Sequence, residues 1–389
     1  LMSRKLKDNL LNGLIWLSAA FSVGILITIV AFIFSNGWSK MSWDFLTNDY
    51  ESQTQYVNVT SHQSYTAPSS LSSDALFSEN LGIAIEPNEH GYEVAWIDDQ
   101  SPVKTAKNNA DEAFPVKVGY QLEQINGEGA NLKIKADTDA DDITNALNAS
   151  DTLMIKVVSP GGGIFPMIVS TLMLILVALL FSAPVGILAA IYMVEYAKPG
   201  KLVNLIRFAT EVLSGIPSVV YGLFGMLIFA NTLKLGMSIL SGGFTLMILL
   251  LPTMMRTTEE ALKAVPMSYR EASYGLGANK IQTLSKVVLP SAIPGILVGV
   301  ILSIGRTIGE SAALLFTIGT FAKLPVNPTS GHLSLFETGT SLTVRAYVEV
   351  KESGNVEMAA AIGIVILVIV FTLNLISRLI SKKFSKANY

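Results

Sequence analysis

The sequence predicts a mainly helical, polytopic membrane protein with six transmembrane helices and a polar α+β domain inserted between the first and the second. Of the 389 residues, 50% are hydrophobic and only 15% are charged, whereas a soluble globular protein carries about 25% charge. The region 35–163 is polar throughout and separates the first apolar stretch from the rest. Six stretches are long and apolar enough to cross a hydrocarbon core about 30 Å thick. They are residues 9–39, 157–194, 212–233, 235–255, 287–322 and 358–377.

The composition excludes several kinds of functional site. The chain has no cysteine, so disulfides, thiolate metal sites and thiol catalysis are ruled out. Its three histidines, His62, His90 and His332, are scattered along the sequence, and the net charge of −3 gives no support for a nucleic-acid partner. We therefore expect no metal site in this chain.

The first apolar stretch has two possible interpretations. A basic start with Arg4, Lys5 and Lys7 fits a signal peptide, but the apolar run is much longer than the roughly 7–15 residues of a signal core. No clear small-x-small cleavage site follows it. We predict a retained span, so that segment 1–34 holds a cytoplasmic N-terminus and the first transmembrane helix.

Basic residues predict the orientation in the membrane, because cytoplasmic loops are enriched in Lys and Arg. With the N-terminus inside, the inside segments hold 15 basic residues and the short outside segments hold four, Lys234, Lys323, Arg345 and Lys351. Both termini are then cytoplasmic, and the insertion 35–163 is extracytoplasmic.

The insertion differs from the rest of the chain, with 19 acidic and 7 basic residues between 35 and 163. Its first part, 35–77, shows little periodicity, and we expect it to be irregular. Asn126-Gly127 is a strong tight-turn pair, and the glycines after Pro160 indicate a flexible exit. Strands are expected at 81–85, 93–97, 122–125 and 152–158, and a short helix at 141–148.

Four motifs of the insertion resemble PDZ domains over about 78–159. They are NLGIAI (80–85), SPVKTA (101–106), VGYQLEQINGE (118–128) and DDITNALN (141–148), and the third departs from the family, which usually has an acidic residue after the Gly. The resemblance implies that the loop before the NLGIAI strand receives a peptide C-terminus, with strand addition at the sheet edge. The alternative is a small β-rich domain that binds no peptide.

Residues 256–290 form the longest inside loop, which we call the coupling loop. It is too polar to cross a membrane, and its pattern predicts a helix, a turn at Gly275 and Gly277, and a second helix with an apolar face. Glycine permits close approach of the turn to another surface. Such a unit suits insertion into a groove of a soluble partner.

The coupling loop resembles that of bacterial ABC-importer permeases. The family pattern is Glu-Ala followed by a small residue, then Gly, then apolar-x-Leu-Pro. This sequence departs from it mildly, with Ser273 where the family usually has Ala and Val287 where it usually has Ile. The resemblance implies a type I permease fold over 164–389, docking of the loop on separate ATPase subunits, and mechanical transmission of the loop's movement to the spans. The matching positions are Glu271, Ala272, Ser273, Gly277, Val287, Leu289 and Pro290.

The flanking segments 211–225, 251–266 and 276–319 resemble the A-type permeases (PstA) of phosphate-specific ABC importers. This implies a companion C-type permease, two ATP-binding subunits that use ATP and Mg²⁺, an extracytoplasmic phosphate-binding protein, and the lipid of a bacterial inner membrane. The sequence has no Gly-x4-Gly-Lys-Ser/Thr motif. With this resemblance we expect the partners to hydrolyse ATP, and we expect this chain to hold no catalytic residue and no cofactor and not to be an enzyme. Two alternatives stay open: a permease for sulfate, molybdate or phosphonate, and a membrane tethering or signalling protein acting through its PDZ-like module.

Two charges interrupt the fifth apolar stretch, Arg306 and Glu310. A charge at mid-membrane costs roughly 2.5–3.5 kcal/mol on insertion scales. Their spacing of four predicts one helix face, and they form either a structural ion pair or part of the anion path. Arg offers paired donors that suit phosphate oxygens, and a Glu can accept a hydrogen bond from protonated phosphate but not from sulfate.

Small residues near this pair predict close helix packing. Gly295–Gly299 and Gly305–Gly309 each have the spacing of four that lets membrane helices approach, within this subunit or against a companion permease. Ser214–Ser218, with Pro217, predicts a kink in the third span.

Overall fold

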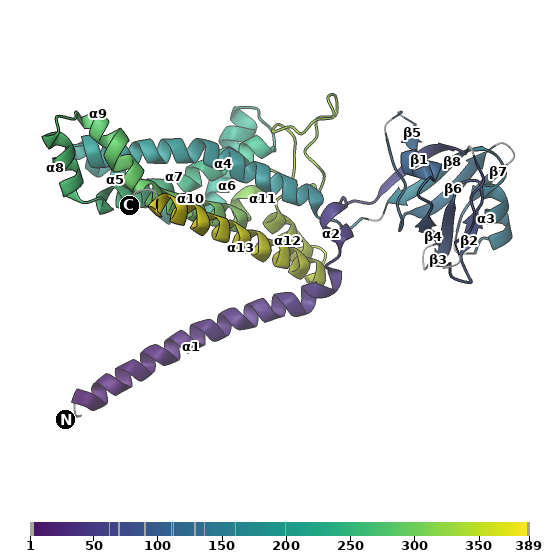
Figure 1. The fold of residues 1–389 in the computed structure, drawn as a ribbon, viewed down its shortest axis with the longest axis horizontal. Coiled ribbons are helices and arrows are strands. Elements are labelled where there is room, and N and C mark those ends of the chain that lie inside the picture. Colours follow the sequence, from purple (N-terminus) through teal and green to yellow (C-terminus); the bar gives the residue numbers. More distant parts are fainter. Residues whose placement is uncertain are drawn as a thin grey trace. The chain divides into compact units, whose positions relative to one another are not determined.

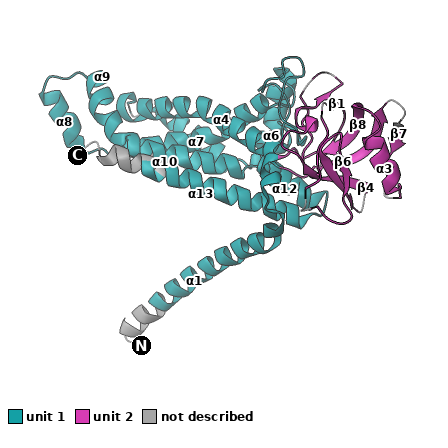
Figure 2. Cartoon of the chain, turned by 45° about the vertical axis from the view of Figure 1, so that its right-hand side comes forward, with its two compact units in different colours: residues 1–47, 164–389 teal, residues 48–163 magenta. Residues whose placement is uncertain are grey.

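The structure, a computed structural model, describes residues 4–386 except 62, 69, 70, 89, 90, 110, 112, 128, 129, 136, 160 and 199. The chain divides into two compact units (Figure 2): a helical unit made of 1–47 and 164–389, and a strand-rich unit made of 48–163. We call the second unit the module. It begins earlier than the predicted PDZ-like boundary near residue 78.

The helical unit is built from long helices joined by short helical turns (Figure 1). Three of those turns, η3, η4 and η5, are π-helical and continue directly from α4, α6 and α9. The helices are α1 (Arg4–Gly37), α2 (Trp43–Thr47), α4 (Phe165–Ile191), α5 (Lys201–Gly215), α6 (Ser218–Gly225), α7 (Ile239–Ala264), α8 (Met267–Gly275), α9 (Lys280–Thr283), α10 (Leu289–Gly309), α11 (Ala312–Leu315), α12 (Leu342–Lys351) and α13 (Val356–Lys386). The turns are η1 (Trp38–Lys40), η3 (Tyr192–Tyr196), η4 (Met226–Thr232) and η5 (Leu284–Val288).

Among the described residues, five helical stretches are long and apolar enough to cross a membrane. The predicted third span is instead a pair of helices, Lys201–Gly215 and Ser218–Thr232, bent by 101° at the break. Ile216 and Pro217 separate them, with Pro217 directly before α6. Proline has no N–H to continue the helical ladder, so the predicted kink is confirmed and is a complete break. The count is six spans if the bent pair is one span.

Glycines bring the central helices together. α4 packs along α7, and α7 along α10. A Cβ at Gly186 would overlap Met254, and one at Gly299 would overlap the Thr257 side chain. The predicted Gly295–Gly299 packing is therefore confirmed within this chain, whereas Gly305 and Gly309 have nothing within 4 Å of a Cβ position.

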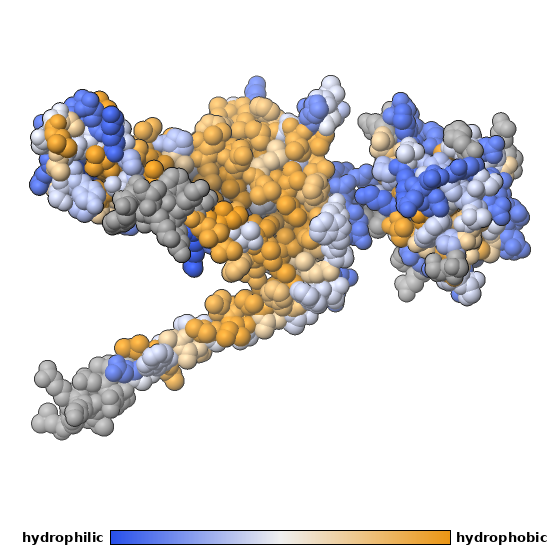
Figure 3. Space-filling model, in the orientation of Figure 1, coloured by the Kyte–Doolittle hydropathy of each residue, from blue (hydrophilic) through white to orange (hydrophobic). Residues whose placement is uncertain are grey.

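The outer surface of the helical unit is largely apolar (Figure 3). α1 is the extreme case, because its most apolar window has 0% of its residues buried in this chain. Its contact with α13 is tight at the end, where a Cβ on Gly37 would overlap the backbone of Ala360 and Ala361. An all-round apolar helix requires lipid or protein around it, which fits a retained membrane span.

The module is one antiparallel sheet, whose described strands run in the order β2-β3-β4-β6-β8-β1-β5, with β7 paired to β6. α3 (Ala140–Leu147) packs beside β2, β6 and β7, and the short turn η2 (Pro102–Thr105) precedes β5. The strands are β1 (Gln53–Thr60), β2 (Leu76–Ser78), β3 (Ile83–Asn88), β4 (Gly91–Ile97), β5 (Lys107–Asn108), β6 (Gln121–Gly127), β7 (Ala130–Lys133) and β8 (Thr152–Ser159).

The module's elements confirm most of the predicted ones. The four expected strands appear as β3, β4, β6 and β8, and the expected helix as α3. The expectation that 35–77 is irregular is wrong at β1, which pairs with β8 from Gln53↔Ser159 to Thr60↔Thr152. Val57 and Val59 alternate with exposed residues there and enter the core, so the missed signal was a short period of two.

Two predicted local features of the module differ in the structure. Asn126 and Gly127 are paired with Asn131 and Ala130, so the predicted hairpin is confirmed but these two residues belong to strand β6 and are not its turn. Residues 128–129 lie outside the described residues. The glycine exit is not a free linker, because Gly162 N donates to Tyr50 O and Gly163 N to Asp49 O. A Cβ at Gly163 would overlap the backbone of Asn48, so close backbone pairing explains these glycines.

Candidate functional site

The coupling loop is a rigid pair of short helices. α8 ends at Gly275, Gly277 takes a φ of +82°, and α9 starts at Lys280. Asn279 and Gln282 cap α9 reciprocally, with two hydrogen bonds of 2.9 Å. The Ser273 and Thr283 hydroxyls, both buried, bond across the turn at 2.9 Å. The predicted helix–glycine turn–helix is confirmed.

The loop presents apolar side chains outward while its polar anchors are buried. Leu276 is 90% exposed and Ile281 68% exposed, and Met267 and Tyr269 are also exposed. Of the signature residues, Glu271 and Ala272 are exposed, and Leu289 and Pro290 begin α10 half-buried. An apolar patch on an exposed turn is typical of a protein-binding surface.

Arg306 lies three residues before the end of α10, with an exposed side chain. Its Nη1 donates to the hydroxyl of Thr253 on α7, at 3.4 Å. This length marks a weak hydrogen bond. Among the described residues, no carboxylate forms an ion pair with Arg306.

Glu310 does not share a helix face with Arg306, which corrects the expectation from their spacing. α10 ends at Gly309, and Glu310 has extended backbone (φ −81°, ψ 121°). Its Oε1 accepts a hydrogen bond of 3.2 Å from Ala313 N at the start of α11, and its carbonyl accepts one of 2.9 Å from Thr343 Oγ1. Within the described part of the chain, Arg306 and Glu310 form no ion pair with each other. The alternative of a structural ion pair is therefore wrong within this chain.

The peptide groove implied by the PDZ resemblance is filled by the module's own chain. β2 pairs with the outer edge of β3, from Leu76↔Ile85 to Ser78↔Ile83. Ser78 Oγ and Asn80 N both donate to Asn148 Oδ1 at the end of α3. Addition of a peptide strand at this edge requires that β2 first leave it, which corrects the expectation of an open edge.

The loop before β3 is also covered. Gly82 has a φ of +60°, and a Cβ there would overlap the ring of Tyr65. Tyr65 N donates to Glu79 O at 2.8 Å, and Ser61 Oγ donates to Asn80 O at 2.5 Å. The segment between β1 and β2 therefore covers the position where a peptide carboxylate would bind.

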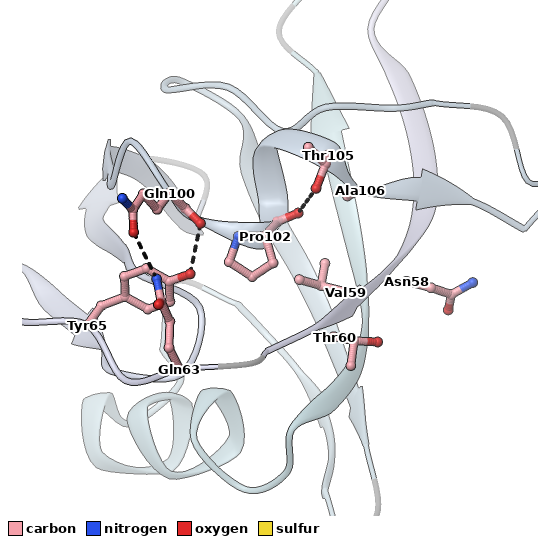
Figure 4. A pocket seen from close by; sticks show the side chains of 9 residues that line it. All are labelled: Asn58, Val59, Thr60, Gln63, Tyr65, Gln100, Pro102, Thr105 and Ala106. Atoms are coloured by element: carbon pink, nitrogen blue, oxygen red, sulfur yellow. Dashed lines mark hydrogen bonds between the residues drawn. The ribbon is translucent and has the colours of Figure 1, made fainter.

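A cavity of about 500 Å³ lies beside this cover (Figure 4). Amide or hydroxyl side chains and apolar side chains both line it, and none of its lining residues is charged. The Tyr65 hydroxyl donates to Gln100 O at 2.8 Å, and Gln63 Nε2 contacts Gln100 Oε1 at 3.3 Å. The lining residues are Asn58, Val59, Thr60, Gln63, Tyr65, Gln100, Pro102, Thr105 and Ala106.

The helical unit matches a known family model. Residues 182–386, more than half of the chain, match the binding-protein-dependent transport system inner membrane component. The chain belongs to this family. It is a multipass inner-membrane permease component, and the coupling loop and Arg306 both lie within the matched region.

Named relatives support the same assignment. Bacillus subtilis YqgI, a probable ABC transporter permease protein, is 37% identical over 235 residues, which cover 57% of this chain and 79% of YqgI. Mycobacterium tuberculosis PstA 1, a phosphate transport system permease protein, is 33% identical over 56% of this chain and 70% of that protein. Yersinia pestis PstA is 41% identical over 40% of this chain and 53% of that protein. The resemblance to PstA-type permeases predicted from the sequence is confirmed.

A solved inward-facing structure of the MetNI methionine ABC transporter is also similar, with a TM-score of 0.45 and 17% identity over 57% of this permease and 94% of that chain.

Sequence reasoning missed the residues that hold the coupling loop in place. Arg270 is buried and makes an ion pair of 2.8 Å with Glu195, and Lys280 Nζ lies 4.6 Å from the ring centroid of Tyr196. Two signals were available: Arg270 directly precedes Glu271 of the signature, and Glu195 follows the long apolar stretch of the second span.

Proposed function

We propose that this chain is the transmembrane permease subunit of an ATP-driven importer of inorganic phosphate. It forms half of the translocation path, and a companion C-type permease supplies the other half. Two separate ATPase subunits bind ATP and Mg²⁺, and an extracytoplasmic phosphate-binding protein delivers the anion. Both termini and the coupling loop are cytoplasmic, and the module 48–163 lies on the opposite side of the membrane.

The coupling loop is the observation that carries this proposal. Its buried anchors, Ser273 and Thr283, fix the two helices, while Leu276 and Ile281 are exposed at the turn. A fixed helical turn with an apolar tip suits a groove on a soluble partner. Glu271 and Ala272, exposed on α8, supply the family-specific part of that surface.

Arg306 supports an anion as the substrate. An arginine left exposed on a membrane span must face a polar path or a partner, because a charge in lipid is costly. Its guanidinium fits phosphate oxygens with paired donors. Glu310 lies at the helix break that follows α10 and is a second path residue in our proposal, where its carboxylate accepts a hydrogen bond from a protonated oxygen of phosphate.

We also assign the module to a PDZ-like domain whose peptide groove is filled by its own β2. The order β3, β4, η2, β6, α3, β8 follows the order of the resembling motifs, and the β2–β3 pairing supports self-coverage of the groove. In this assignment the module is not needed for the coupling loop to bind its partners.

Affinity purification from membranes tests the proposed function. With a tag on this chain, an ATPase and a second permease should co-purify in a stable complex. Leu276→Asp should remove the ATPase but keep the second permease, because it places a charge in the apolar contact. Val118→Asp, at an exposed position of the module, is the matched control and should keep both. Absence of an ATPase from the wild-type preparation would contradict the proposal.

A further inference from the structure

The turn at the end of α4 contacts both short helices of the coupling loop, α8 and α9. Glu195 and Tyr196 are consecutive residues of η3, the π-helical turn that ends this span. Glu195 forms an ion pair with the guanidinium of Arg270 on α8, and the ring of Tyr196 makes a cation–π contact with the ammonium of Lys280 on α9. Two neighbouring side chains of one span thus contact the helices on either side of the glycine turn.

The contact between Arg270 and Glu195 is buried and geometrically specific. The two side chains are only 10% and 9% exposed. Arg270 Nε and Nη2 both donate to Glu195 Oε1, at 3.2 and 2.8 Å. A buried pair of this kind is strongly destabilised when one partner is removed, because the other charge is left uncompensated.

The same guanidinium also joins the coupling loop to α7. Arg270 Nη1 donates to Val265 O at 2.9 Å, and Nη2 donates to Leu262 O at 3.0 Å. These carbonyls lie at the C-terminal end of α7, where helices leave acceptors without an intrahelical partner. One side chain therefore fastens α8 to the ends of two spans.

The hydrogen bond between the Ser273 and Thr283 hydroxyls joins α8 to α9. Beneath them, Val265 and Val288 are buried in a cluster with Met193 of η3 and Leu262 of α7. A force applied to the exposed tip of the loop is thus passed to the ends of α4 and α7 through packed and hydrogen-bonded atoms. Interiors packed to this density transmit displacement instead of absorbing it.

The spans α4 and α10, which adjoin the coupling loop, each have a π-helical turn at one end. η3 ends α4, and η5 (Leu284–Val288) connects α9 to α10. Such turns are rare and are frequently found at functional sites. η3, which carries Glu195 and Tyr196, directly follows α4, and η5 directly precedes α10.

We propose that Glu195 and Tyr196 form a clamp through which the movement of the coupling loop passes to the spans, with Arg270 and Lys280 as their partners. This inference rests on the proposed coupling to ATPase subunits and names the residues that perform it. All four are positioning residues, because they contact neither substrate nor nucleotide in this arrangement. Loss of the clamp should uncouple ATP hydrolysis from transport, so that less phosphate is transported for each ATP hydrolysed.

The test compares coupling in the assembled complex. Wild type, Glu195→Gln and Arg270→Lys are purified with their partners and reconstituted with the binding protein, and phosphate transported per ATP hydrolysed is measured. Allosteric coupling commonly corresponds to about 5- to 150-fold, so we expect the ratio to fall on the order of tenfold while the subunits still co-purify. Glu259→Gln is the matched control, since the ion pairs of Glu259 are with Arg207 on α5 and Lys263 on α7, outside α8 and α9. Its ratio should stay at the wild-type value.

Two further variants test the clamp if the Glu195→Gln subunit fails to assemble with its partners. Tyr196→Leu and Lys280→Gln change exposed side chains and should lower the same ratio about severalfold, consistent with a cation–π contact of about 0.5–1 kcal/mol at an exposed site. An unchanged ratio in these variants, or a loss of transport only in proportion to lost complex, overturns the clamp. Failure of the proposed function is a different result, because then wild type itself yields no ATPase and no phosphate uptake.

Discussion

The guanidinium of Arg306 on α10 donates to the hydroxyl of Thr253 on α7 across 3.4 Å, and the Arg306 side chain is exposed in this chain. This contact orients the side chain without neutralising its charge. In the proposed function, this charge is available to an anion passing between this subunit and its companion.

Arg306→Gln should lower the rate of phosphate uptake by more than tenfold, because it removes the cation while keeping a polar side chain of similar length. Arg306→Lys should retain part of the activity, since it keeps the charge but not the paired donors. Uptake of labelled phosphate at matched membrane expression measures both. Normal uptake by Arg306→Gln would exclude a role in the path.

Two substitutions at Glu310 distinguish a role in the anion path from a role as the cap of α11. Glu310→Gln keeps an oxygen that can accept from Ala313 N but removes the charge. We expect lower phosphate uptake with normal thermal stability of the purified subunit. If Glu310 only caps α11, Gln would instead be neutral, and only Glu310→Ala would show a defect, of about 1 kcal/mol in stability.

Gly299 and Gly305 form a matched pair for helix packing. Gly299→Val should destabilise the α7–α10 contact by about 1–3 kcal/mol, because its Cβ would overlap the Thr257 side chain. Gly305→Ala should be tolerated, since nothing lies within 4 Å of its Cβ position. Thermal unfolding of the purified subunit in detergent measures both. Equal melting temperatures would contradict the packing described.

The cover of the module's groove depends on Asn148. Asn148→Ala removes the acceptor that Ser78 Oγ and Asn80 N share and leaves the Ser78 hydroxyl with its 3.4 Å contact to Leu147 O. Each lost hydrogen bond costs about 0.5–1.5 kcal/mol. We expect faster proteolytic cleavage between 61 and 80 in the full-length protein, while cleavage in the membrane unit stays unchanged. Asn131→Ala, on the β6–β7 hairpin, serves as the control and should cleave like wild type.

The module should be removable, because its two ends meet. Gly163 N bonds to Asp49 O, and Ile164 N bonds to Phe45 O at 2.8 Å. Joining Thr47 to Ile164 through a short Gly-Ser linker should therefore leave the helical unit folded and still able to co-purify with an ATPase. Loss of the ATPase after this deletion would show that the module takes part in assembly.

Local patterns predicted most helices and strands, whereas contacts distant in sequence were the source of the errors. The coupling loop was predictable because Gly277 and the capping Asn279 act within a few residues. The Arg306–Glu310 pairing failed because Ser311 to Leu315 begin a new helix, which no four-residue spacing reveals. The pairing of Arg270 with Glu195 was missed because each residue stands beside a recognised motif but the two are 75 residues apart. β1 was missed because its apolar residues are few and its partner strand, β8, is nearly a hundred residues away.

Uptake of labelled phosphate by the reconstituted complex, with unlabelled competitors, tests the proposed substrate and the energy coupling together. We expect uptake that depends on ATP and that excess unlabelled phosphate abolishes. Equal excesses of sulfate, molybdate or methylphosphonate should leave the uptake rate within about twofold of the rate without competitor, which corresponds to less than about half a kcal/mol. Uptake suppressed by sulfate or molybdate as strongly as by phosphate, or uptake that proceeds without ATP, would contradict a phosphate-specific ABC permease.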